Sequence, residues 1–318
     1  MNPIRPFLDQ QGVLILDGGL ATQLEARGAD LHDPLWSAKL LLENPALIQQ
    51  VHLDYFWAGA DCAITASYQA TIPGFMRRGL TEAQAIKLLK LTVQLAQTAR
   101  DEFWRVQQGA EGRIRPLVAA SIGPYGAYLA NGAEYTGDYD LDEEGLVAFH
   151  RPRWEILAES EADLLACETI PSLTEARALT QLLRVTPNRY AWLSFSCRDG
   201  RSLSDSTPIT ECVALLEKME QVAAIGINCT APRFIPELIS QLFAITQKPI
   251  IVYPNSGEHY DPITKRWHGL SIPAEFGTYS REWRKGGAAI IGGCCRTGPE
   301  HIRQIRDRFR TKFVVDPT

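Results

Sequence analysis

The sequence predicts a single (β/α)8 barrel domain that spans residues 1–318. Eight short segments rich in β-branched and other apolar residues recur along the chain, and helical patterns lie between them. Most of these segments are apolar on both faces, which is typical of parallel strands covered by helices. Eight strand–helix units favour a closed barrel, with an open doubly wound sheet as the alternative.

The eight expected strands each end near a polar side chain. The strands are Val13–Leu16, Cys62–Ala66, Leu117–Ala120, Leu164–Cys167, Ala191–Ser196, Val222–Ile227, Ile250–Tyr253 and Ala288–Ile291. The polar residues at their C-terminal ends are Asp17, Thr65, Ser121, Glu168, Cys197, Cys229, Asn255 and Cys294. A barrel brings all eight ends to one rim, where active sites lie, whereas an open sheet separates the ends of its second and eighth strands.

Capping residues and prolines mark the expected helix starts between the strands. The segments Thr81–Gln84 and Ser172–Glu175 each match a capping box, and apolar residues follow them at helical spacing. Pro236 and Pro299 suit the first turn of two further helices, because proline lacks the amide hydrogen that this turn leaves unpaired.

The composition is that of an ordinary globular protein. The chain is 45% hydrophobic and 22% charged, with a net charge of -5 and no long basic run, which argues against nucleic-acid or anionic-membrane binding. No stretch approaches the roughly 18 consecutive apolar residues of a membrane span. The first twelve residues lack the apolar segment of a secretory signal, so a cytoplasmic location is expected. The oligomeric state is left open.

Seven cysteines in a reducing compartment point to metal binding or burial rather than to disulfides. Cys229 ends the sixth expected strand, and the adjacent pair Cys294 and Cys295 follows the eighth after two glycines. Three thiolates at strand ends predict one zinc ion with an open fourth position. The alternative is that these cysteines are simply buried. Cys62, Cys167 and Cys212 are expected in the core, and Cys197 is a further candidate for the site.

A zinc ion with three thiolate ligands is suited to holding a fourth sulfur as a thiolate, because thiolate-rich sites stabilise soft ligands. The predicted chemistry is attack by that sulfur on an alkyl donor. The carboxylates Asp17 and Glu168 would need a cationic or donating partner if buried. A substrate amino group would serve both, and a salt bridge or a helix N-cap is the alternative.

Two long segments after expected strands are rich in aromatic residues. Residues 123–145 contain four tyrosines, and residues 254–276 contain Asn255 together with aromatic residues. Long loops after barrel strands are often functional, and aromatic faces attract cations. The alternative is that these rings only pack the loops together.

Several of these segments together resemble the homocysteine S-methyltransferase family. The segments are 17–19 (DGG), 66–71 (ASYQAT), 121–128 (SIGPYGAY), 167–169 (CET), 228–230 (NCT), 253–258 (YPNSGE) and 292–295 (GGCC), and the likeness covers about residues 13–309. The resemblance implies a zinc-dependent (β/α)8 barrel that methylates homocysteine. The two tyrosine-containing loops are most similar to the branch that uses S-methylmethionine as the donor.

Residue by residue, the resemblance implies that Cys229, Cys294 and Cys295 bind Zn²⁺ and that Asp17 and Glu168 hold the amino group of homocysteine. Thr65 lies where the betaine-dependent enzymes also have threonine, although Ile64 replaces a glutamine, and Thr169 replaces their tyrosine. Candidate contacts of the sulfonium donor are Tyr125, Tyr128, Tyr253 and Asn255. S-adenosylmethionine is a possible second donor. Betaine or a corrinoid are alternative donors, and a thiol-redox or zinc-sequestering protein is the non-enzymatic alternative.

Overall fold

The strands form a closed parallel barrel in the computed structural model, which describes residues 1–33, 35–108, 113–261, 266–269 and 271–309. The sheet order is β1 (Leu14–Ile15), β10 (Ala288–Ile291), β7 (Ile250–Tyr253), β6 (Val222–Asn228), β5 (Ala191–Phe195), β4 (Leu164–Ile170), β3 (Leu117–Ile122) and β2 (Cys62–Ile64). A parallel bridge between Leu16 and Cys62 joins the first and last strands of this order. The open-sheet alternative is therefore excluded.

The expected strands all occur, with small shifts at their ends. The seventh and eighth have the expected bounds, and the first two are shorter than expected. The third and fourth run on to Ile122 and Ile170, so Ser121 and Glu168 lie inside the ends of strands rather than after them. Their side chains are therefore held by the sheet itself.

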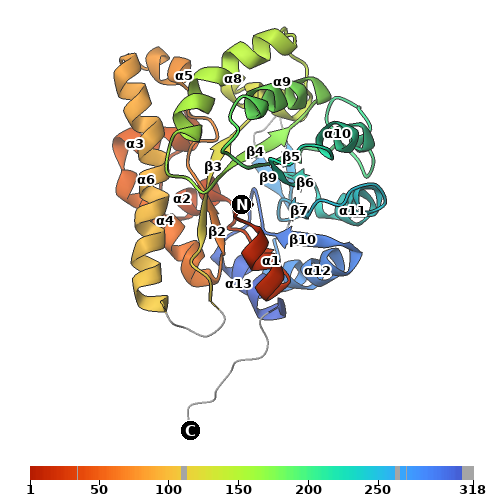
Figure 1. The fold of residues 1–318 in the computed structure, drawn as a ribbon. Coiled ribbons are helices and arrows are strands. Elements are labelled where there is room, and N and C mark those ends of the chain that lie inside the picture. The colour runs from red at the N-terminus through yellow and green to blue at the C-terminus, as the bar shows by residue number, and fades with distance from the viewer. Residues whose placement is uncertain (34, 109–112, 262–265, 270, 310–318) are drawn as a thin grey trace.

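Helices surround the barrel as a ring (Figure 1). The longer ones are α4 (Pro45–Ala58), α6 (Glu82–Gln107), α8 (Glu143–Ala158), α9 (Leu173–Arg184), α10 (Ile209–Leu216), α11 (Ile235–Phe243), α12 (Pro273–Gly286) and α13 (Pro299–Phe309). The shorter ones are α1 (Arg5–Gln11), α2 (Leu20–Ala26), α3 (Leu40–Glu43), α5 (Ile72–Arg77), α7 (Tyr125–Leu129), η1 (Trp36–Lys39), η2 (Ala133–Tyr135) and η3 (Pro232–Phe234). A hairpin of β8 (His259–Asp261) and β9 (Arg266–His268) lies in the segment after β7.

The predicted helix starts are confirmed, with one exception in detail. Thr81 and Gln84 form the expected reciprocal capping box at the start of α6. Ser172 caps α9 by accepting from the Glu175 amide at 3.2 Å. The carboxylate of Glu175, however, accepts from the Tyr125 amide at 2.6 Å instead of completing the box. This part of the prediction was wrong, because a long-range contact takes the carboxylate that the local motif would use.

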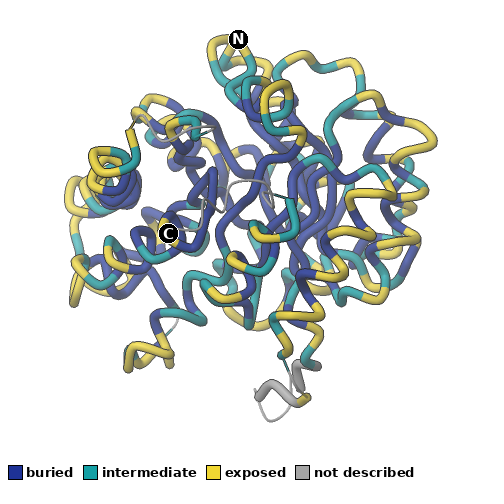
Figure 2. Tube along the Cα trace, turned by 90° about the horizontal axis from the view of Figure 1, so that it is seen from below, coloured by how far each residue is buried: buried dark blue, intermediate teal, exposed yellow. Residues whose placement is uncertain are grey.

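Two apolar cores hold the barrel together. The larger lies between the strands and the helix ring, and the smaller fills the barrel interior. Ile4 and Phe7, from the segment that forms α1, belong to the interior core, so this segment closes one end of the barrel. Figure 2 shows the buried strands at the centre and the exposed helix faces outside. No helix in the described residues is long and apolar enough to cross a membrane.

Candidate metal centre

Three sulfur atoms from two distant parts of the chain meet at the C-terminal rim of the barrel. The Sγ atoms of Cys229, Cys294 and Cys295 all lie within 4.8 Å of one another, and those of Cys229 and Cys295 are 3.5 Å apart. The strands that deliver them, β6 and β10, are not neighbours, because β7 lies between them. Their approach therefore depends on the curvature of the closed barrel.

The backbone around the sulfurs is fixed by close contacts and hydrogen bonds. Cys229 adopts a left-handed φ of 49°, and its amide donates to the Tyr253 carbonyl at 3.2 Å. The Cys294 amide donates to the Pro254 carbonyl at 2.8 Å. A Cβ at Gly293 would lie 2.2 Å from Oγ1 of Thr297, so only glycine fits there. These constraints hold the cysteines before any ligand binds.

The three thiols share protons in the absence of a cation. Hydrogen bonds from the Cys294 and Cys295 thiols lower the pKa of Cys229 well below its usual range. The same contacts with Cys229 raise the pKa of Cys294 and of Cys295. One thiolate is thus stabilised at the expense of two protonated neighbours, and a divalent cation would relieve this competition by binding all three as thiolates.

The arrangement fits a zinc ion. Zinc–sulfur bonds of about 2.3 Å in a tetrahedron place sulfurs roughly 3.8 Å apart, close to the separations seen here. Within the described residues, this group is the one whose ligand atoms gather closely enough to hold a metal, and Cys197 does not belong to it. Cys62, Cys167 and Cys212 are buried in the core, as expected.

Asp17 is buried beside this centre, and no cationic side chain among the described residues pairs with it. Asp17 is 2% exposed. Its Oδ2 accepts a hydrogen bond from the Ile64 amide at 2.8 Å, and its Oδ1 is buried with no hydrogen-bond partner among the described residues. Burial, and to a smaller extent the nearby Glu168 carboxylate, raises the pKa of Asp17 well above its usual range. An orphaned buried oxygen of this kind indicates a missing donor.

Glu168 lies across the barrel mouth from Asp17 and is 6% exposed. Its Oε1 accepts a hydrogen bond from the Ser121 hydroxyl. Burial raises the pKa of Glu168 to about 7, although Ser121 and the Tyr253 hydroxyl oppose the rise. In the described part of the chain, no Lys, Arg or His forms an ion pair with Asp17 or with Glu168. Asp17 and Glu168 are therefore two buried carboxylates whose oxygens can accept hydrogen bonds from a cationic group.

Thr65 and Tyr253 belong to the hydrogen-bond network around Glu168. Oγ1 of Thr65 lies 2.7 Å from Oγ of Ser67 and accepts from the Ser121 amide at 3.0 Å. Tyr253 is 1% exposed, and its hydroxyl accepts a hydrogen bond from the Trp192 indole N–H at 3.1 Å. Thr65 supports Glu168 through Ser121, whereas the Tyr253 hydroxyl interacts with Glu168 directly.

Tyr125 and Tyr128 lie in an aromatic cluster over α8. The Tyr125 ring lies 4.8 Å from Phe149 and 5.4 Å from Tyr139, and the Tyr128 ring lies 5.2 Å from Phe149. The Arg77 guanidinium covers Tyr128 at 4.5 Å. Both rings take part in loop packing, and their role as contacts of the methyl donor stays a prediction.

Asn255 lies on the loop that follows β7, beside the metal centre. Its amide donates to the Thr230 carbonyl at 3.2 Å. The next residue, Ser256, donates its amide to the Cys295 carbonyl at 3.1 Å. The aromatic side chains expected further along this loop, at residues 259–268, lie outside the described residues.

Glu134 and Tyr135 are site residues that sequence reasoning missed. Both belong to η2, and the Tyr135 hydroxyl lies 3.4 Å from Sγ of Cys229. Ser196 at the end of β5 donates to the Glu134 carbonyl at 3.1 Å, which ties this turn to the rim. The signal in the sequence was only the tyrosine-rich composition of residues 123–145, which does not say which hydroxyl approaches the sulfurs.

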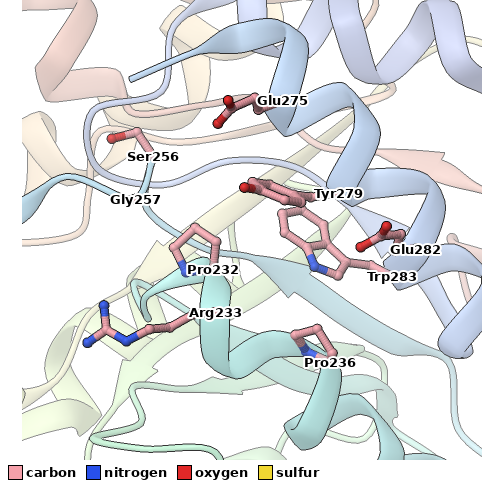
Figure 3. Close-up of a pocket in the computed structure, with 9 residues that line it drawn as sticks. All are labelled: Pro232, Arg233, Pro236, Ser256, Gly257, Glu275, Tyr279, Glu282 and Trp283. Carbon is pink, nitrogen blue, oxygen red and sulfur yellow. The ribbon is translucent and has the colours of Figure 1, made fainter. Parts of the chain in front are cut away.

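A separate cavity of about 430 Å³ lies outside this centre (Figure 3). It is bounded by η3 and α11 on one side, α12 on another, and the loop at Ser256 and Gly257. Its acidic residues, Glu275 and Glu282, are exposed, and no cysteine lines it. The three cysteines and the two buried carboxylates therefore lie outside this cavity.

Comparison with known proteins gives one family. Residues 14–309 match the family described as homocysteine S-methyltransferase. A homocysteine S-methyltransferase of Bacillus subtilis is 56% identical over 305 residues, covering 96% of this chain and 97% of that protein. The crystal structure of the oxidised form of the homocysteine methyltransferase MmuM from Escherichia coli superposes with a TM-score of 0.88 at 50% identity, covering 97% of this chain and 100% of that one. Its metallated form gives 0.87 at 49% identity, covering 96% of this chain and 100% of that one.

Proposed function

The chain belongs to the homocysteine S-methyltransferase family, and we propose that it transfers a methyl group from S-methylmethionine to homocysteine at a zinc ion held by Cys229, Cys294 and Cys295. Methyl transfer to homocysteine follows from the family. The zinc ion, the donor and the roles of individual residues are our proposal. The observation that carries it is the meeting of three sulfurs within 4.8 Å at the barrel rim.

The three cysteines would hold the ion through their sulfurs, leaving room for a fourth ligand. When bound there, zinc would keep the homocysteine sulfur ionised, since a free thiol with a pKa of about 8.5 is mostly protonated at neutral pH. A metallated form of the Escherichia coli relative supports the proposal that this chain binds a metal. The donor set of three thiolates favours zinc over harder cations.

Asp17 and Glu168 would bind the ammonium group of homocysteine. An ammonium has three donors, which match the orphaned Oδ1 of Asp17 and the carboxylate of Glu168. The arriving positive charge would favour the ionised form of both groups and reverse the effect of burial. These two residues therefore orient the nucleophile rather than move a proton.

The transfer itself needs no general acid. The homocysteine sulfur gives an electron pair to the methyl carbon, and the pair of the breaking carbon–sulfur bond stays on the donor sulfur. The sulfonium becomes a neutral thioether, so two molecules of methionine form and no proton is required at the leaving group. The chain's own contribution is to hold both molecules in line.

S-methylmethionine is preferred because the loop motifs at residues 121–128 and 253–258 are most similar to the branch that uses it. S-adenosylmethionine is also a sulfonium, and we include it as a second donor. We place the reaction in the cytoplasm, where the three thiols would stay reduced.

The test is to incubate zinc-loaded protein with homocysteine and each of four donors, namely S-methylmethionine, S-adenosylmethionine, betaine and methylcobalamin, and to quantify methionine. We expect the fastest turnover with S-methylmethionine. Faster turnover with betaine or methylcobalamin would refute the donor assignment. Uptake of zinc without methionine from any donor would favour a sequestering or redox protein.

A further inference from the structure

One carboxylate oxygen of Glu134 is buried although the residue as a whole is half-buried. Its Oε2 atom is buried and has no hydrogen-bond partner in the part of the chain that the structure describes. The backbone on either side is fixed, because Ser196 donates to the Glu134 carbonyl and the next residue, Tyr135, touches Cys229. Among the described residues, neither an ion pair nor a helix-capping hydrogen bond accounts for the buried position of this oxygen.

The adjacent residue places Glu134 beside the metal centre, because the Tyr135 hydroxyl lies 3.4 Å from Sγ of Cys229. The negative charge of Glu134 contributes to the raised pKa of Cys295 and of Tyr68. Burial raises the pKa of Glu134 itself to about 7, and Cys229 adds to the rise. A negative group held near three sulfurs is unfavourable in the free protein, so its partner is expected to be a cation that arrives with a substrate.

The ammonium of homocysteine already has a site at Asp17 and Glu168, which lie on β1 and β4 at the barrel mouth. Glu134 instead lies on η2, above the rim. The second substrate must bring its methyl carbon within about 3 to 3.5 Å of the homocysteine sulfur before transfer. Its positive sulfur is bonded to that carbon, so the sulfonium is the cation that must come closest to the sulfurs.

We propose that Glu134 binds the sulfonium centre of the methyl donor and so selects cationic donors over their neutral products. The inference rests on the proposed function, since it needs a sulfonium substrate. It adds a specificity residue on the loop side of the site, separate from the cysteines and from the homocysteine carboxylates.

The role has a kinetic signature. The donor loses its positive charge as the methyl group leaves, so Glu134 attracts the ground state at least as strongly as the transition state. Removing its charge should therefore raise the KM for the donor while changing kcat little. The product methionine carries no sulfonium, so its binding should depend less on Glu134, which favours release after turnover.

The experiment measures both KM values in zinc-loaded wild type, Glu134→Gln and Asp138→Asn. Asp138 is the matched control, because it is an exposed acid on the same loop. We expect Glu134→Gln to raise the S-methylmethionine KM about tenfold or more, as loss of one charged contact does. The homocysteine KM, the zinc content and the Asp138→Asn values should stay within about twofold. Glu134→Asp, which keeps the charge, should recover most of the donor KM.

Two outcomes would overturn the inference while leaving the proposed function standing. One is a donor KM in Glu134→Gln equal to that of wild type. The other is an equal rise in the KM of homocysteine, which would indicate general damage to the site. Wild type that makes no methionine from any sulfonium donor would instead refute the proposed function, and this inference with it.

A second probe separates the two cations of S-methylmethionine. Dimethylsulfonioacetate carries a sulfonium but no ammonium, and it can be measured as a donor or as a competing ligand. We expect Glu134→Gln to weaken its binding by a similar factor. A penalty confined to S-methylmethionine would assign Glu134 to the ammonium group and overturn the sulfonium assignment.

Discussion

Replacing Glu168 with glutamine should stabilise the free protein and weaken its binding of homocysteine. Glu168 is buried, accepts from Ser121, and has no basic partner among the described residues. Burial raises its pKa from the ordinary 4.5 to about 7. At 1.36 kcal/mol per pKa unit, this difference corresponds to about 3 kcal/mol as an upper limit.

The sign follows from proton binding. Because the folded pKa lies above the unfolded value, the folded state holds the proton more tightly between pH 4.5 and about 7. The contribution of Glu168 to the stability of wild type is therefore largest below pH 4.5. This contribution is lost as the pH rises to about 7. Glutamine does not titrate, so the gain from Glu168→Gln should be small near pH 5 and reach up to about 3 kcal/mol at pH 8.

The assay is guanidinium unfolding of reduced, metal-free wild type and Glu168→Gln at pH 5 and pH 8. The difference between the two proteins cancels the titration of groups that they share. With zinc restored, the homocysteine KM of the variant should rise by about 30-fold or more, since an ammonium loses a charged partner. A variant that is less stable than wild type at pH 8, or equally stabilised at both pH values, would refute the reasoning.

Three further predictions follow from the same contacts. Cys294→Ser should lose bound zinc and methionine formation together, measured by metal analysis and product assay; activity in a zinc-free variant would contradict the mechanism. Glu175→Gln should destabilise the protein by about 2–4 kcal/mol in guanidinium unfolding, because the buried Glu175 pairs with His150 at 2.8 Å. Loss of the carboxylate would also leave the buried charge of Arg153 without its negative neighbour. A stabilised variant would contradict this prediction. Mild oxidation should consume two thiols per chain and release zinc, reversibly with dithiothreitol, since the sulfurs of Cys229 and Cys295 lie 3.5 Å apart; zinc retained after loss of those thiols would argue against the site.

The buried residues Glu168 and Glu175 show what local sequence patterns can predict and what they cannot. Both follow strand or cap signals that are visible in the sequence, at the end of β4 and in the first turn of α9. Their different surroundings are not visible there. Glu175 contacts His150 from α8 and the Tyr125 amide, whereas Glu168 contacts the Ser121 hydroxyl and, among the described residues, no basic side chain. The expected opposite signs of their substitutions come from these long-range contacts alone.

The loop of residues 123–145 shows the same limit. Its composition predicted aromatic side chains near the rim, and four tyrosines were available for that place. Tyr125 and Tyr128 pack against Phe149 of α8, while Tyr135 reaches Cys229. Rings of the same kind in one irregular segment have no periodicity, so only the folded path of the loop decides which of them turns toward the sulfurs.

The sequence alone determined the alternation of strands and helices and put reactive side chains at strand ends, because hydrophobic period and capping are local properties of the chain. Closure of the sheet through Leu16 and Cys62, and with it the meeting of Cys229 with Cys294 and Cys295, was decided by the tertiary structure. So was the position of Glu134, which depends on contacts between segments far apart in sequence. Local free energies specify the elements, but only packing among all of them sets which side chains face one another.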